Sequence, residues 1–124
     1  NLSQTELQVD IREIVDSVGS TLKFLNLSET GCTGDIKIMA MAPKLEHINL
    51  SKTRIGGDIS VFSKNTPNMQ YLELSFSGVR GYVDELVHCT GLMYINLSQT
   101  RCMGDKKKLT AALPDCKSII LPGS

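Results

Sequence analysis

The sequence predicts a solenoid of stacked strand–turn–return coils, and three observations support this. A five-residue segment recurs with little change at residues 26–30, 49–53 and 96–100. The leucine at its second position recurs at intervals of 23 to 25 residues from Leu2 to Leu121. A glycine follows these segments in phase at positions 34, 57 and 104, and Gly81 follows the related segment 73–77 in the same way. One such repeat cannot bury its own apolar face, so neighbouring repeats must stack into a continuous core.

Each repeat opens with a short strand pattern, read in the second repeat as Leu22-x-x-Leu25-x-Leu27. Residues 45–50, 69–74 and 92–97 repeat the pattern. Because side chains alternate along a strand, Leu25 and Leu27 are expected to point inward, whereas Phe24, Asn26 and Ser28 point to the concave surface. In the return segments, the helical spacing of apolar residues across 11–18 predicts a short helix, and another is expected near 109–113, ended by Pro114.

These motifs resemble leucine-rich repeats, and the Gly-x-Ile element with a period near 24 is similar to the plant-specific subclass. The resemblance implies an α/β solenoid: a right-handed leucine-rich-repeat coil with one parallel β-sheet on its concave face and short helices or irregular returns on its convex face. It covers residues 1–124 as a single domain of about five repeats. The repeats begin near Asn1, Leu22, Leu45, Met69 and Leu92, with a partial last one from Cys116.

The sequence departs from the family at one position, where hydroxyl residues replace the ladder asparagine. We expect this column to bond the turn backbone of adjacent coils, which is structural work. Its members are Thr5, Thr30, Thr53, Ser77 and Thr100.

The charge balance, with 13 basic and 13 acidic residues, argues against nucleic acid and against anionic membranes as partners. No run of about 18 apolar residues exists, so membrane insertion is not expected. The basic run Lys106–Lys108 is interpreted as a solvated helix face.

Three of the four cysteines occupy repeat slots that hold aliphatic residues elsewhere, and Cys89 lies in a return segment. We expect reduced core thiols, which favours a cytoplasmic location. The Asn-Leu-Ser sequons and the subclass leave an extracellular location open. No zinc-ligand spacing is present, and no cofactor is expected. The other three cysteines are Cys32, Cys102 and Cys116.

A column of aspartates is the one metal candidate in the sequence. Oxygen ligands in register could hold calcium, but Tyr82 interrupts the column, and a short aspartate at a turn usually caps the following helix. Capping is therefore the favoured interpretation, and no metal site is assigned. The column consists of Asp10, Asp35, Asp58 and Asp105.

The candidate binding site is an aromatic ridge on the concave face. Phe24, His47, Tyr71 and Tyr94 share one strand slot, and Phe76 is expected near them. Exposed, clustered aromatic side chains are typical of interface hot spots. The alternative is that the rings only stabilise the sheet. A polar column beside the ridge is expected to add hydrogen bonds: Asn26, Asn49, Glu73 and Asn96.

The sequence thus predicts a non-enzymatic module that binds a protein or peptide on its concave sheet. No catalytic residues are assigned, because the hydroxyl groups repeat as ladders. One alternative is a scaffold subunit that associates through uncapped ends, including self-association through exposed apolar terminal repeats. Another is a secreted receptor-type ectodomain. A chain that starts and stops inside a repeat is also expected to be a fragment of a longer one.

Overall fold

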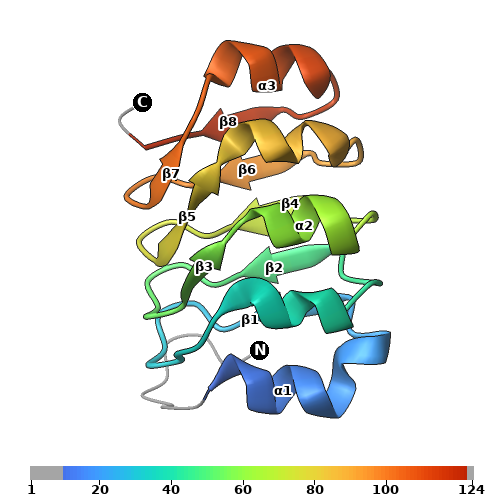
Figure 1. The fold of residues 1–124 in the computed structure, drawn as a ribbon, viewed down its shortest axis with the longest axis vertical. Helices are drawn as coiled ribbons and strands as arrows, with labels where there is room; N and C mark the ends of the chain where they lie inside the picture. The colour runs from blue at the N-terminus through green and yellow to red at the C-terminus, as the bar shows by residue number, and fades with distance from the viewer. Residues whose placement is uncertain (1–9, 123–124) are drawn as a thin grey trace.

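The computed structural model describes residues 10–122, which form a solenoid with two parallel sheets (Figure 1). The five-stranded sheet lines the concave face, and its strands follow one another in chain order. They are β1 Phe24–Asn26, β2 His47–Asn49, β4 Tyr71–Glu73, β6 Tyr94–Asn96 and β8 Ser118–Ile120. A three-stranded sheet lies along one side, with strands β3 Gly56–Asp58, β5 Gly78–Tyr82 and β7 Arg101–Met103.

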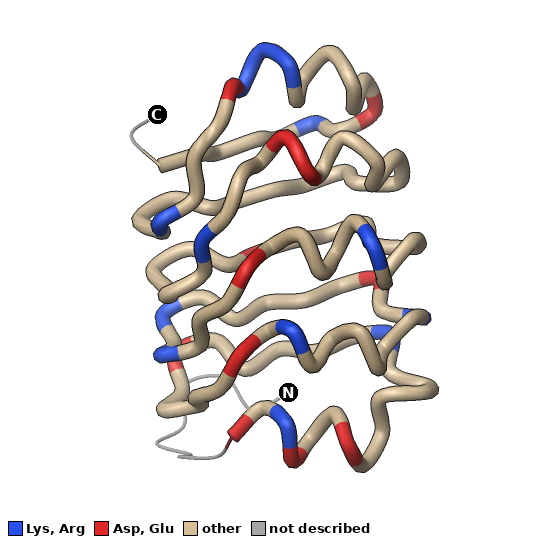
Figure 2. Tube along the Cα trace, in the orientation of Figure 1, with Lys and Arg blue, Asp and Glu red and all other residues tan. Residues whose placement is uncertain are grey.

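Short helices cover the face opposite the five-stranded sheet (Figure 1). The predicted helix at residues 11–18 is confirmed, and the second predicted helix begins earlier than expected, at Lys106. Lys106, Lys107 and Lys108 are exposed, as expected for a solvated helix face. Figure 2 shows this basic run at the start of α3. The helical segments are α1 Ile11–Val18, η1 Gly19–Thr21, η2 Ile36–Met41, α2 Ser60–Asn65, η3 Val83–His88 and α3 Lys106–Ala112.

The register of the five-stranded sheet follows the sequence repeat. Phe24 pairs with His47, His47 with Tyr71, and Tyr71 with Tyr94. The inward positions one residue later are all buried, from Leu25 to Ile119. The predicted fold class, the strand register and the assignment of inward-pointing side chains are therefore confirmed for the described residues. The second sheet was not expected from the sequence.

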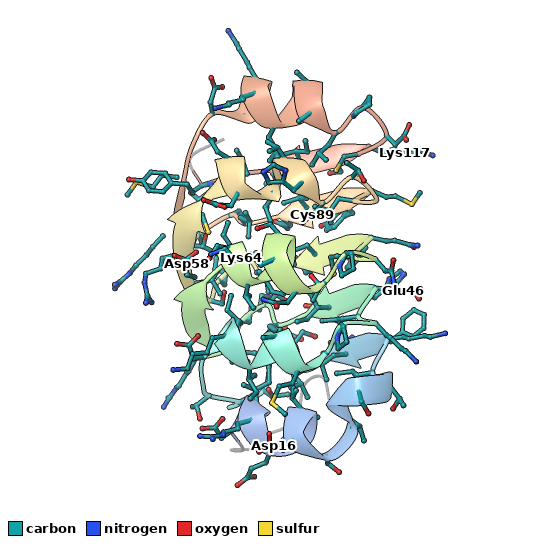
Figure 3. All side chains as sticks on the ribbon, turned by 45° about the vertical axis from the view of Figure 1, so that its right-hand side comes forward. Asp16, Glu46, Asp58, Lys64, Cys89 and Lys117 are labelled. Atoms are coloured by element: carbon teal, nitrogen blue, oxygen red, sulfur yellow. The ribbon has the colours of Figure 1, made fainter. Side chains whose placement is uncertain are left out.

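A continuous apolar core fills the space between the sheets and the helices (Figure 3). Cys32, Cys89 and Cys102 are buried in it, and Cys116 is half-buried against it. All four are free thiols, in agreement with the sequence-based expectation. Burial raises the pKa of Cys32 and of Cys89 to about 11, so these thiols stay protonated at neutral pH.

The residues of the hydroxyl column do not form the hydrogen bonds to adjacent coils that the sequence predicted. Thr53 Oγ1 donates to the Leu50 carbonyl of its own coil at 2.7 Å and accepts from the Ile55 amide at 3.4 Å. Thr30 and Thr100 form the same pair of bonds, and Ser77 forms the first of them. The prediction of bonds to adjacent coils is therefore wrong, because these short side chains lie inside the turn and reach only its local backbone.

Neighbouring coils are joined instead by backbone hydrogen bonds and by a contact between a glycine and an aspartate. In successive turns, the Lys52 amide donates to the Ser75 carbonyl at 2.9 Å, continuing the sheet ladder. Gly81 has a φ of +121°, and a Cβ built on it would lie 2.6 Å from Asp58 Oδ1 in the preceding coil. Gly34 and Gly57 pack on Asp10 and Asp35 in the same way. Glycine is needed here for its conformation and for its lack of a side chain.

The expected apolar surface at the terminal repeats is not found in the last described coil. Leu109 and Leu113 are almost completely buried, and Ile119 and Leu121 are only 8% and 6% exposed. They are buried because α3 and β8 pack onto the preceding coil, within the same core cluster. That prediction is wrong for this end. The expectations for Asn1, Leu2, Thr5 and the rest of the first repeat up to residue 9 lie outside the described residues.

Candidate binding surface

The predicted ridge is a stack of rings that crosses four strands. Phe24 and His47 have ring centroids 4.8 Å apart, and those of His47 and Tyr71 are 5.7 Å apart. Tyr71 and Tyr94 are 4.5 Å apart with planes 8° from parallel. Neighbouring rings cover one another's faces. The stack therefore presents ring edges and tyrosine hydroxyl groups to the concave side. A ligand that uses all four rings must run along the solenoid axis, across the strands.

The polar column beside the rings is held in place by serines two residues later. Asn49 Oδ1 accepts from both the amide and the hydroxyl of Ser51, at 3.1 and 2.9 Å. Asn26 and Asn96 form the same pair of bonds with Ser28 and Ser98. The sequence analysis missed this support, although the recurring Asn-x-Ser spacing is its signal.

This arrangement leaves some amide nitrogens free to donate. Within residues 10–122, the Asn26 and Asn49 side-chain nitrogens form no hydrogen bond, whereas Asn96 Nδ2 donates to Glu73 Oε1 at 3.1 Å. Both free groups line a shallow hollow of about 380 Å³, together with Phe24, His47 and Tyr71. The backbone strands carrying Leu25 and Ile48 form its floor. The hollow thus offers ring edges beside two hydrogen-bond donors on adjacent strands.

Glu73 occupies the slot that holds asparagine in the coils of β1, β2 and β6, and it is the acidic residue of the polar column. Its Oε2 atom is buried and has no hydrogen-bond partner. Burial raises the pKa of the Glu73 carboxyl, and the neighbouring donors Ser75 and Asn96 oppose that shift only in part. Burial also raises the pKa of Tyr71, with further contributions from Tyr94 and Glu73.

Phe76 lies apart from the ridge. It occupies the turn after β4 with a φ of +56°, its side chain is exposed, and no ring contact joins it to the stack. Glu29, Lys52 and Gln99 occupy the equivalent turn positions with the same conformation. The structure thus brings together the four stacked rings and the four polar residues and leaves Phe76 outside.

The aspartate column caps the return segments. Asp10, Asp35 and Asp105 each accept a hydrogen bond from the amide two residues later at 2.8 Å, and Asp58 does so at 2.9 Å. Among the described residues, no group of three or more His, Cys, Asp or Glu side chains is placed to hold a metal ion. Also within them, no helix is long and apolar enough to cross a bilayer.

Comparison with solved structures identifies the architecture. The LRR ectodomain of the receptor kinase SOBIR1 from Arabidopsis thaliana is similar over 86% of this chain and 61% of its own length, with a TM-score of 0.72 and 20% identity. This chain has the leucine-rich-repeat fold. The leucine-rich-repeat solenoid described above and that ectodomain thus share backbone geometry at low sequence identity.

Two further solved structures are similar to this leucine-rich-repeat chain. The plant peptide hormone receptor RGFR1 in complex with RGF2 matches over 98% of this chain and 27% of its own, with a TM-score of 0.67 and 18% identity. A plant ice-binding protein matches over 96% and 47%, with a TM-score of 0.53 and 22% identity. The chain spans less than two thirds of any of these structures. No model of a protein family matches the sequence, and no curated protein matches it significantly.

Proposed function

We propose that this leucine-rich-repeat chain is a non-enzymatic module that binds a polypeptide on its concave face. The observation that carries the proposal is the ring stack with its adjacent hollow, where exposed ring edges lie beside the free amide donors of Asn26 and Asn49. Aromatic anchors with a few placed polar groups are the usual composition of such surfaces.

The donors favour a ligand rich in carbonyl groups. Asn26 and Asn49 are direct partners on adjacent parallel strands, so their free nitrogens repeat at about 4.8 Å. An extended polypeptide presents carbonyl oxygens along its whole length, and its side chains can pack on the ring edges. RGFR1, which has the same fold, is a receptor for a peptide hormone, and this supports the choice of ligand class.

Catalysis has little to support it at this site. His47 is the histidine on the concave face, and the side chains stacked on it are the rings of Phe24 and Tyr71. A general base needs a nucleophile or an orienting acid within hydrogen-bond reach. The recurring hydroxyl groups of the chain are engaged with the backbone of their own turns.

A selection of displayed random peptides on the immobilised protein tests the proposal. We expect the selected peptides to bind at least about tenfold more weakly to an Asn49→Asp variant, because the new carboxylate still accepts from Ser51 but repels carbonyl oxygens. Tyr71→Ala should weaken binding as well. Gln99→Glu makes the same amide-to-acid change on an exposed turn outside the hollow, and it should have no effect.

Peptides that bind all of these variants equally, or a selection that yields no binder, would rule out the concave site. A structural role of the rings alone predicts such a result together with a loss of stability in Tyr71→Ala. Thermal unfolding of each variant, measured alongside binding, separates the two interpretations.

A further inference from the structure

A second block of interface-type side chains lies on the three-stranded sheet. Arg80 and Tyr82 of β5 are direct register partners of Arg101 and Met103 of β7. Val79, which precedes Arg80, and Cys102, which lies between Arg101 and Met103, are buried in the core, whereas the four residues of the two pairs are exposed. Tyr82 and Met103 are 62% and 60% exposed, and both arginines are exposed. We call these four residues the lateral patch.

The two arginines do not stabilise the fold in any way that the structure displays. Neither side chain forms an ion pair or hydrogen bond with another described residue. Like charges on paired strand positions repel one another. Asp58, the register partner of Arg80 on β3, uses its Oδ1 atom to cap Ser60. Arg80 thus has one carboxylate on the neighbouring strand, but no ion pair within the described residues holds either arginine side chain.

Tyr82 lowers the stability of its coil in another way, through the loss of a helix cap. It occupies the slot that holds Asp35, Asp58 and Asp105 in the other coils, and each of these accepts a backbone amide of the segment that follows. Tyr82 precedes η3 and forms no side-chain cap. The coil thus lacks a helix cap and instead exposes an aromatic ring beside Met103.

We propose that the lateral patch docks an acidic polypeptide segment, with carboxylates on Arg80 and Arg101 and an apolar side chain against Tyr82 and Met103. Arginine, tyrosine and methionine are enriched at protein interfaces, and arginine binds carboxylates through paired hydrogen bonds. Half of the patch is apolar, which favours a polypeptide over a nucleic acid. This surface lies on the sheet at the side of the solenoid and is separate from the concave ring stack (Figure 1).

Titration of isotope-labelled protein with short capped peptides tests the proposal. The probe is a peptide of alternating glutamate and leucine, and the matched control peptide has glutamine in place of glutamate. We expect the acidic peptide to shift the amide signals of residues 78–82 and 101–103. Its affinity should fall at least about fivefold as salt rises from about 50 to 300 mM. The control peptide should bind much more weakly.

Variants separate the patch from general charge effects. The double change Arg80→Gln/Arg101→Gln should abolish binding, whereas Arg54→Glu, which alters the net charge by the same two units at an exposed arginine outside the patch, should leave it nearly unchanged. Tyr82→Asp should weaken binding while raising the melting temperature, because it restores the cap found in the other coils. Weaker binding in that variant cannot be attributed to misfolding.

Equal affinity for the acidic and the control peptides would overturn the proposal. Signal changes confined to other residues, or undiminished binding by Tyr82→Asp, would do the same. An oligouridylate that shifts the same amide signals more strongly than the acidic peptide would also overturn it, in favour of nucleic acid. Absence of any binding by the acidic peptide contradicts it directly.

Discussion

Tyr71 and Tyr94 lie on paired strand positions, with ring centroids 4.5 Å apart and planes 8° from parallel. The strand spacing of a parallel sheet, about 4.8 Å, sets this separation, so the backbone itself imposes the stack. We therefore expect the stack to stabilise the sheet as well as to bind a ligand. The size of that role can be measured.

A double-mutant cycle on Tyr71→Ala and Tyr94→Ala measures it. We expect a coupling free energy of about 0.5–1.5 kcal/mol, in the range found for aromatic pairs. Chemical denaturation of the wild type, the two single variants and the double variant gives the value. Phe24 and Tyr71 are separated by His47, so their cycle should be additive. Strong coupling in that control pair would show that the whole sheet responds to each change.

Glu73→Gln is expected to stabilise the protein at neutral pH. Because burial raises the pKa of Glu73 in the folded state, its contribution to stability is complete below the pKa of the unfolded chain. It is lost as the pH rises through the folded pKa. The variant should melt at a higher temperature than the wild type at neutral pH, and this difference should shrink on acidification towards pH about 4.

The same change at the exposed Glu85 controls for the loss of one negative charge. It should not reproduce the pH-dependent difference. A Glu73→Gln variant that melts below the wild type at neutral pH would show that the carboxylate has a stabilising partner.

Gly81→Ala should destabilise the fold by more than about 1 kcal/mol. The position combines a φ of +121° with a Cβ position 2.6 Å from Asp58 Oδ1, so an alanine is both strained and in collision. Gly91→Ala is the matched control, since its Cβ would meet only the Met69 carbonyl oxygen at 3.5 Å. Equal stability of the two variants, by urea unfolding, would show that the coils are not in close contact at Gly81.

Cysteine alkylation should be slow in the folded protein. The thiolate is the reactive form, and burial raises the pKa of Cys32 and Cys89 to about 11. With iodoacetamide at mildly alkaline pH, we expect Cys116 to react first, because it is half-buried and the other three are buried. Peptide mass mapping over time reads out the order, and all four should react together in denaturant. Early labelling of Cys89 would contradict the packing described.

Much of the five-stranded sheet could be predicted because its slots repeat the same residue types. Phe24, His47, Tyr71 and Tyr94 share a slot, and the structure pairs them in that register. The second sheet could not be predicted in this way. Its strands contain Gly56, Gly57, Gly78 and Gly81, and glycine has low strand propensity and gives no alternating pattern.

The site was predicted in part for related reasons. The sequence places a residue in a slot but does not show its hydrogen bonds, so the serine support of Asn26 and Asn49 was missed. Phe76 was placed near the ridge because it is close in sequence, but the positive φ of its turn directs the chain away from the sheet. The lateral patch depends on the pairing of β5 with β7, which no periodicity indicated.

Thr53 closes its hydrogen bonds within its own turn, and Thr30 and Thr100 do the same. The side-chain hydrogen bonds of such a turn are therefore contained within one coil. The contacts between coils are the recurring glycine–aspartate contact and the backbone hydrogen bonds of the sheet. Duplication or deletion of one complete coil would therefore preserve every such bond, whereas gain or loss of one residue inside the turn between Leu50 and Ile55 would break the two bonds of Thr53. Evolution can lengthen or shorten this molecule most readily in whole coils.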